Sequence, residues 1–171
     1  MAKLFFNYST MNAGKSTILL QAAHNYEERG MVPYLLTAEI DNRSGEGKIA
    51  SRIGIEKRAD TFNDRLNLYN LLKSKQKSSP IACVLIDEAQ FLTKEQVWQL
   101  ARAVDDLFLP VLCYGLRVDF QGKLFPGSSA LLGLADELKE IKTICHCGKK
   151  ATMVVRKSAN NKPIKDGSQI Q

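Results

Sequence analysis

The fold is decided by the stretch Tyr8–Thr17, which reads YSTMNAGKST. It follows a short apolar run, Leu4–Phe6, and opens an amphipathic segment that extends to Arg29. A turn of small residues between a strand and a helix lets consecutive backbone N–H groups converge on phosphate oxygens, at the positive end of the helix dipole. We therefore predict a phosphate-binding loop, with a strand before it and a helix over about 15–29 after it.

The side chains of this loop match the nucleotide-binding pattern G-x-x-x-x-G-K-[ST] at all but one position. Lys15 supplies positive charge for the terminal phosphates, and the Ser16 hydroxyl is a candidate magnesium ligand. Ser9 stands where the first glycine is expected, and serine adopts a positive φ less readily than glycine. A chance match within a structural turn is the alternative, which the strand-then-helix context disfavours. The sequence thus predicts a nucleoside triphosphate bound with Mg²⁺.

Length and charge limit the class of protein. A chain of 171 residues forms one domain with a real core and has room for a small appendage. The formal charge of +6 is confined to residues 142–171, which carry seven basic residues and one acidic residue, whereas residues 1–141 are neutral. Such a dispersed basic segment is as typical of a solvated surface as of a phosphate site, so we expect no nucleic-acid partner. Without a signal peptide or about 18 consecutive apolar residues, we expect a cytoplasmic protein with no membrane partner.

Apolar runs alternate with helical patterns along the rest of the chain. This alternation predicts an α/β fold, a parallel sheet with right-handed crossovers and helices on its faces. Thr93 and Gln96 predict a capping box, followed by a buried helical stripe of Val97, Leu100, Ala101, Val104 and Phe108. The other expected elements are strands over 32–38, 81–86, 111–116 and 137–144, helices over 64–75 and from Gly127, a polar loop over 73–79, and an extra strand within 52–58.

Two acidic residues, Asp87 and Glu88, end the apolar run 81–86. A continuous apolar run is typical of a central parallel strand that is covered on both faces. In a phosphate-binding-loop protein, an acidic residue at the end of such a strand lies beside the loop and holds magnesium. We assign that role to Asp87. Glu88, the next residue, points elsewhere and is free to take a proton.

Two loops at predicted strand ends are candidates for ligand contact. Open α/β sheets bind ligands at the carboxyl ends of their strands, where Asp41 and Arg43 lie; a plain surface loop is the alternative. Phe120 and Phe125 lie in the charged loop 117–127. Their rings either face a flat nucleobase or fill the core, and composition alone does not decide between these roles.

The four cysteines form two kinds of pair. Cys83 and Cys113 lie in apolar runs and are expected to be inert core residues. Cys145 and Cys147 flank His146 in a turn, which in a reducing compartment favours half of a metal site. We expect 152–155 to be the return strand of a small hairpin. A tetrahedral zinc needs two further ligands. None follows Cys147, so either the chain given is incomplete, a neighbouring subunit supplies them, or the pair binds nothing.

Five stretches in order resemble the zinc-containing thymidine kinases of the cellular and bacterial type: Ser9–Thr17, Thr37–Asp41, Asp87–Phe91, Cys113–Arg117 and Thr143–Gly148. The resemblance implies a P-loop (RecA-like) parallel sheet flanked by helices over 1–141. It also implies a small C-terminal zinc-ribbon-like hairpin unit over 142–171, with a zinc knuckle and the start of a loop that closes over the substrate. A structural Zn²⁺ and a homotetramer are further implications.

Carried over by position, the resemblance makes Glu88 the general base, with Lys15 and Arg43 acting on the transferring phosphate. The implied nucleoside contacts are Met11, Leu116, Phe120 and Phe125. Ser16 and Asp87 would hold Mg²⁺, and Cys145 and Cys147 would hold zinc. Arg156 is a further phosphate contact. The implied ATP contacts are Ser9, Thr10, Met11, Asn12, Ala13, Gly14, Lys15, Ser16, Thr17, Asp87, Glu88, Ala89 and Gln90.

The expected function is transfer of the γ-phosphate of ATP to the 5'-hydroxyl of thymidine or deoxyuridine, in nucleotide salvage for DNA synthesis. One alternative is a P-loop ATPase acting on nucleic acid, in which Glu88 activates water. The neutral charge of residues 1–141 offers little support for it. Another is a zinc-ribbon binding module with a vestigial nucleotide fold, which does not explain why Lys15, Asp87 and Glu88 are all present.

Overall fold

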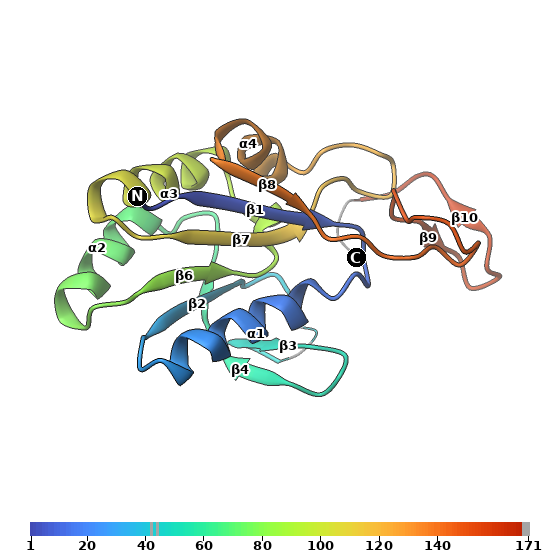
Figure 1. Cartoon of the computed structure of the whole chain (residues 1–171). Coiled ribbons are helices and arrows are strands. Elements are labelled where there is room, and N and C mark those ends of the chain that lie inside the picture. The colour runs from blue at the N-terminus through green and yellow to red at the C-terminus, as the bar shows by residue number, and fades with distance from the viewer. Residues whose placement is uncertain (42, 44, 169–171) are drawn as a thin grey trace.

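Six parallel strands form the main sheet of the computed structural model, which describes residues 1–41, 43 and 45–168. The predicted α/β fold with a parallel sheet is confirmed (Figure 1). The strands are β1 (Leu4–Ser9), β2 (Pro33–Ala38), β5 (Asp60–Phe62), β6 (Cys83–Ile86), β7 (Val111–Leu116) and β8 (Glu137–Glu140). Their spatial order is β5-β2-β6-β7-β1-β8, so β7 separates β1 from β6.

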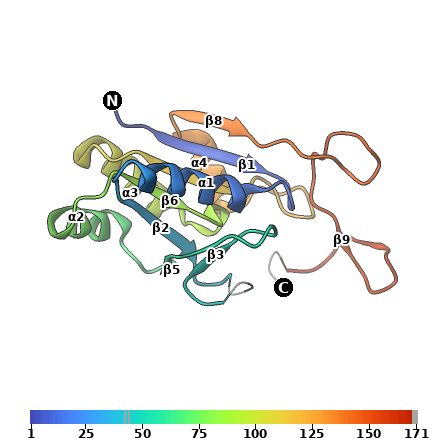
Figure 2. The ribbon, with the colours of Figure 1, turned by 60° about the horizontal axis from the view of Figure 1, so that its bottom comes forward.

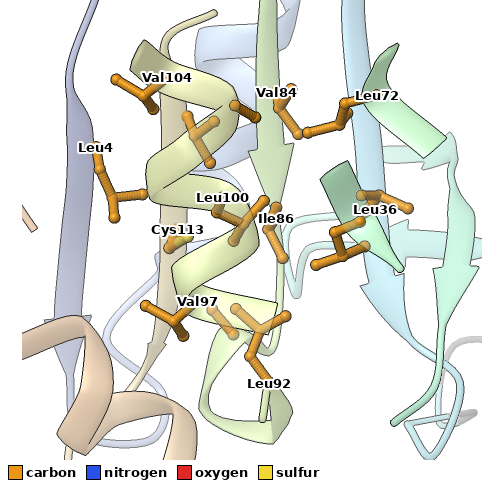
Figure 3. Packing of buried hydrophobic residues seen from close by; sticks show 14 of the residues in the cluster. Leu4, Leu36, Leu72, Val84, Ile86, Leu92, Val97, Leu100, Val104 and Cys113 are labelled. Atoms are coloured by element: carbon orange, nitrogen blue, oxygen red, sulfur yellow. The ribbon is translucent and has the colours of Figure 1, made fainter. Parts of the chain in front are cut away.

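Helices cover both faces of the sheet, as Figures 1 and 2 show. The helices are α1 (Lys15–Glu28), α2 (Leu68–Ser78), α3 (Lys94–Leu107) and α4 (Pro126–Leu134). Strand β6 shows why two layers form, because its successive side chains point to opposite faces. Cys83 and Leu85 join the cluster around α1, whereas Val84 and Ile86 pack in the cluster around α3 (Figure 3). The fully buried β6 is therefore central, as its apolar run predicted.

The predicted start of α3 is confirmed, but the predicted end of its buried stripe and both predicted bounds of α2 need correction. The capping box before α3 is present, with Gln96 N donating to Thr93 Oγ1 at 3.1 Å. The predicted stripe is wrong at Phe108, which follows the helix in a left-handed conformation and is 79% exposed. Helix α2 begins later than predicted because the Asn67 side chain caps it. The predicted polar loop over 73–79 is also wrong, since α2 continues to Ser78.

Two small hairpins accompany the sheet. Strands β3 (Lys48–Ala50) and β4 (Glu56–Arg58) are antiparallel and lie beside α1, where Ile49 is buried. The predicted extra strand within 52–58 is thus only the second strand of this hairpin. Strands β9 (Arg156–Lys157) and β10 (Pro163–Ile164) form the other hairpin, beyond the carboxyl ends of the sheet strands (Figure 1).

The C-terminal predictions need two corrections. Strand β8 ends at Glu140, and 141–144 are not strand. The predicted return strand over 152–155 is wrong, because the hairpin forms from β9 and β10 instead. A single bridge between Ile144 and Lys150 closes the cysteine turn. Residues 169–171 of the predicted C-terminal unit lie outside the described residues. Across the described ranges, no helix is long and apolar enough to cross a membrane.

The first turn of α4 presses directly on the short 3-10 helix η1 (Ala89–Phe91). A Cβ added at Gly127 would lie 2.5 Å from the Ala89 carbonyl oxygen and 2.7 Å from that of Leu92. Because both neighbours are backbone atoms, Gly127→Ala is expected to destabilise the fold by about 1–3 kcal/mol in urea denaturation.

Gly133→Ala is the matched control, because it lies on the same helix and its added Cβ would meet nothing within 4 Å. We expect this variant to be unchanged or slightly more stable, since alanine favours helix. Equal stability of the two variants would contradict the close packing of α4 on η1.

Candidate active site

The phosphate-binding loop joins β1 to α1, as predicted. Asn12 and Gly14 adopt left-handed backbone conformations within it, with φ of 63° and 77°. Ser9 ends β1 and pairs in register with Leu116 of β7. Since Ser9 is extended there, the position where the pattern expects glycine needs no positive φ, and serine fits without strain.

Lys15 lies folded back across the loop. Its side chain is buried, and Nζ donates to the Thr10 carbonyl oxygen at 2.7 Å. Burial lowers the pKa of Lys15, while the carboxylates of Glu88 and Asp87 act in the opposite direction. The Thr10 hydroxyl oxygen is buried and, among the described residues, has no hydrogen-bond partner. A buried cation and an unpaired hydroxyl within one turn suit a loop that receives a polar, anionic ligand.

The two predicted magnesium ligands lie together. Ser16 Oγ, in the first turn of α1, donates to Asp87 Oδ2, just after β6, at 2.9 Å. Asp87 is 5% exposed, and its other oxygen accepts from the Glu88 backbone N–H at 3.0 Å. Burial raises the pKa of Asp87, against the lowering effect of the Ser16 hydrogen bond. A hydroxyl and a carboxylate beside a phosphate loop are the ligands that Mg²⁺ uses with nucleotides, so these residues fit that ion.

Glu88 adopts a left-handed backbone conformation, with φ of 52°, at the start of η1. A non-glycine residue held there marks local strain, which is common at functional sites. Two side chains donate to its carboxylate. Arg43 Nη2 lies 3.0 Å from Oε1, and Gln90 Nε2 donates to Oε2. Burial, followed by the charge of Asp87, raises the pKa of Glu88 to about 7.

Arg43 ties the loop after β2 to this carboxylate. Its Nε and Nη2 contact the two oxygens of Asp41 at 2.6 and 2.8 Å. Burial would raise the pKa of Asp41, but the hydrogen bonds and charge of Arg43 outweigh burial and lower it. Asp41 and Arg43 thus lie in the site, as their position after a strand predicted. Asn42 and Ser44 of the same loop lie outside the described residues.

The raised pKa of Glu88 predicts a pH-dependent stability difference. Because its pKa in the fold is above the ordinary value of 4.5, ionisation of Glu88 weakens the fold as pH rises from about 4.5 through 7. Without nucleotide or metal, Glu88→Gln is therefore expected to be more stable than wild type by about 1–3 kcal/mol at pH 8. The gain should vanish near pH 4.5. Urea denaturation at both pH values tests this, and a pH-independent difference would contradict it.

The four predicted nucleoside contacts differ in exposure. Leu116 ends β7 beside Ser9, and Met11 is 40% exposed two residues beyond β1. Phe125 is 4% exposed and meets Phe91 of η1 edge to face, with ring centroids 5.9 Å apart. Phe120 is half-buried beneath the guanidinium of Arg156, 4.0 Å from its ring centroid. Phe125 therefore fills space beneath the site, whereas Phe120 links loop 117–125 to the C-terminal unit.

The C-terminal unit also adjoins the phosphate-binding loop. Gln121 Nε2 donates to the Lys165 carbonyl oxygen at 2.9 Å. The phosphate-binding loop, the residues after β7 and the C-terminal unit together line a small hollow at the carboxyl ends of the sheet strands. It is lined by Tyr8, Ser9, Thr10, Arg117, Val118, Glu140, Thr152 and Val154.

The cysteine pairs separate as predicted. Cys83 and Cys113 are buried, each in a different core cluster. Cys145 and Cys147 lie in a tight turn in which the Gly148 N–H donates to the Cys145 carbonyl oxygen at 2.8 Å. Cys145 Sγ lies 3.4 Å from His146 Nδ1. The described part of the chain holds no group of three or more candidate metal ligands, so the structure does not show a complete zinc site around these two thiols.

Two residues beside the site, Phe91 and Ser128, had no predicted role there. No sequence signal marked them, because their contacts are with residues distant in the sequence: Phe91 of η1 meets Phe125, and Ser128 of α4 meets Leu116 of β7. Ser128 Oγ donates to the Leu116 carbonyl oxygen. Asp41 was a candidate for ligand contact, but its contact with Arg43 was not predicted. Its pairing with Arg43 depends on a turn that no local pattern specified.

Known proteins match the chain along its whole length. A family model described as thymidine kinase matches residues 2–170. The thymidine kinase of Ruegeria pomeroyi is 64% identical over 171 residues, which is 100% of this chain and 86% of that relative. The thymidine kinase of Jannaschia sp. is 63% identical, over 100% of this chain and 88% of the relative. That of Rhizobium meliloti is 59% identical, over 99% and 88%.

Proposed function

The chain belongs to the thymidine kinase family and is an ATP-dependent nucleoside kinase, and on this premise we propose the role of each site residue in the reaction. The reaction transfers the γ-phosphate of ATP to the 5'-hydroxyl of thymidine. The observation that carries our assignment is the position of Glu88, whose half-buried carboxylate accepts from Arg43 and Gln90 and lies next in sequence to Asp87, the partner of Ser16.

Glu88 acts as the general base. A carboxylate with a pKa of about 7 accepts a proton efficiently near neutral pH. It takes the proton of the 5'-hydroxyl while that oxygen forms a bond to the γ-phosphorus. The bond from the γ-phosphorus to the bridging oxygen breaks, ADP leaves, and the proton passes from Glu88 to solvent.

Lys15 and Arg43 stabilise the negative charge of the γ-phosphate while it is transferred. Residues 9–17 cradle the phosphates with backbone N–H groups, and Lys15 moves from the Thr10 carbonyl oxygen to the terminal phosphates. Ser16 and Asp87 would hold Mg²⁺, which would neutralise part of the negative charge of the ATP phosphates. Asp41 keeps Arg43 oriented through two contacts.

We place the nucleoside on the side of Glu88 that faces away from the ATP phosphates. We assign Met11, Leu116 and Phe120 to contact with the base, with Phe125 supporting them from beneath. This assignment rests on the family resemblance, on the adjacent ends of β1 and β7, and on the edge-to-face contact of Phe125 with Phe91. Deoxyuridine, which lacks the thymine methyl group, is the closest alternative acceptor.

Phosphate transfer tests the function directly. The protein is incubated with Mg²⁺ and ATP and with either thymidine or single-stranded DNA, and both thymidine monophosphate and free phosphate are measured. We expect thymidine monophosphate to form and DNA to have no effect. ATP hydrolysis that is independent of thymidine and stimulated by DNA would instead indicate an ATPase acting on nucleic acid.

We also propose a structural zinc and a cytoplasmic homotetramer, both from the family resemblance. Cys145 and Cys147 would supply two of four zinc ligands, consistent with their tight turn. Metal analysis of the purified protein should find zinc, and Cys145→Ser should lower the zinc content. Light scattering should give the mass of four chains. Zinc-free protein, or a stable monomer, would refute the corresponding proposal.

A further inference from the structure

Gln90 joins the two halves of the site through one buried side chain. It lies in η1, two residues after Glu88, and is 1% exposed. Its amide Nε2 donates to Glu88 Oε2. Its amide Oε1 accepts from the Leu116 backbone N–H at 3.1 Å. A single side chain therefore connects the carboxylate of Glu88 to the end of β7.

The end of β7 is fitted closely around this amide. A Cβ added at Gly115 would lie 2.7 Å from Gln90 Oε1 and 2.9 Å from Gln90 N. On the far side, Ser128 Oγ donates to the Leu116 carbonyl oxygen, so both backbone polar groups of Leu116 are held by buried side chains. Each end of the Gln90 amide already has a partner within the protein, so turning the side chain toward an ATP phosphate would leave buried groups unpaired.

We propose that Gln90 is a positioning residue that fixes the Glu88 carboxylate relative to Leu116, and is not a ligand of ATP. The proposal rests on the role of Glu88 as general base and adds what holds that base in place. Reaction rates fall steeply when reacting groups are displaced by about 1 Å. A fixed link between Glu88 and the nucleoside side of the site therefore matters for turnover more than for binding.

Gln90→Met tests the proposal, because methionine has a similar length and neither donates nor accepts like an amide. We expect kcat to fall about 10- to 100-fold while KM for ATP changes by less than about threefold. The matched control is Gln96→Met. Gln96 is also 1% exposed and makes hydrogen bonds through both ends of its amide, but these hold Asn63, Leu66 and Thr93 near the start of α3. We expect Gln96→Met to lose stability and keep the wild-type kcat.

Three results would overturn the proposal. Weaker binding of an ATP analogue by Gln90→Met, measured without thymidine, would make Gln90 an ATP ligand. An equal loss of kcat in the Gln90 and Gln96 variants would make its role structural only. A further loss of kcat from Gln90→Met in a Glu88→Gln background would show that it does not act through Glu88. The role of Glu88 is tested separately, because an active Glu88→Gln enzyme refutes the general base whatever Gln90→Met does.

Discussion

Glu88→Gln is expected to lower kcat for thymidine phosphorylation by roughly a thousandfold, because general base catalysis typically contributes 10²- to 10⁴-fold. The amide has nearly the shape of the carboxylate and cannot accept the proton of the 5'-hydroxyl. Binding of ATP should persist, since Lys15, Ser16 and Asp87 are unchanged. Steady-state kinetics with thymidine, together with equilibrium binding of an ATP analogue, separate the two effects.

The matched control for this prediction is Glu56→Gln. Glu56 lies on the β3–β4 hairpin, where its carboxylate contacts Lys48 at 3.3 Å and is 59% exposed. Such an exposed ion pair contributes little to stability, so we expect wild-type kinetics. If Glu88→Gln retained more than about a tenth of the wild-type kcat, the proton would have another acceptor. Asp87 would then be the first residue to test.

The site was predictable wherever its chemistry depends on neighbours in sequence. Lys15 and Ser16 follow the loop in one continuous motif, and Asp87 ends an apolar run that is almost always a buried strand. The structure brings Ser16 and Asp87 within hydrogen-bond distance, as expected if the acidic residue after this strand lies beside the phosphate-binding loop. Ser9 is instructive in another way. Its departure from the pattern suggested strain, yet the residue is extended strand.

The parts that sequence reasoning missed depend on contacts between distant elements. The family resemblance implied that Gln90 binds ATP and did not indicate that its amide contacts Glu88 and Leu116, 26 positions later. Nothing around Gln90 in the sequence indicates that pairing. Strand β5 was missed because its three residues, Asp60–Phe62, carry too few apolar side chains to show a period. It forms only because β2 offers a free edge.

Phe108 shows how a periodic pattern fails at a helix end. The spacing from Val104 predicts burial, but Leu107 is the last residue of α3 and the chain turns with a φ of 53° at Phe108. The helical period predicts which side chains face the core only as far as the helix continues. The sequence signal for the end of the helix was Pro110, two residues after Phe108, and it locates that end only approximately.

Lys15→Met is the other change with a large expected effect, a loss of roughly 10²- to 10³-fold in kcat/KM for ATP, which is typical when one group that stabilises transition-state charge is removed. Methionine fills the same buried space without the charge. Because burial lowers the pKa of Lys15, its charged form is disfavoured in the fold, so the variant should be at least as stable as wild type. Loss of activity with retained stability would assign the effect to chemistry.

Lys77→Met on the exposed side of α2 is the matched control, and it should leave both kcat and KM unchanged. Lys15→Arg should not restore activity, since the larger planar guanidinium does not fit a cradle in which Nζ lies 2.7 Å from the Thr10 carbonyl oxygen. Near-wild-type transfer by Lys15→Met would mean that Arg43, and not Lys15, stabilises the charge of the γ-phosphate. Arg43 is held by Asp41 and Glu88, so it would then serve the general base and the phosphate at once.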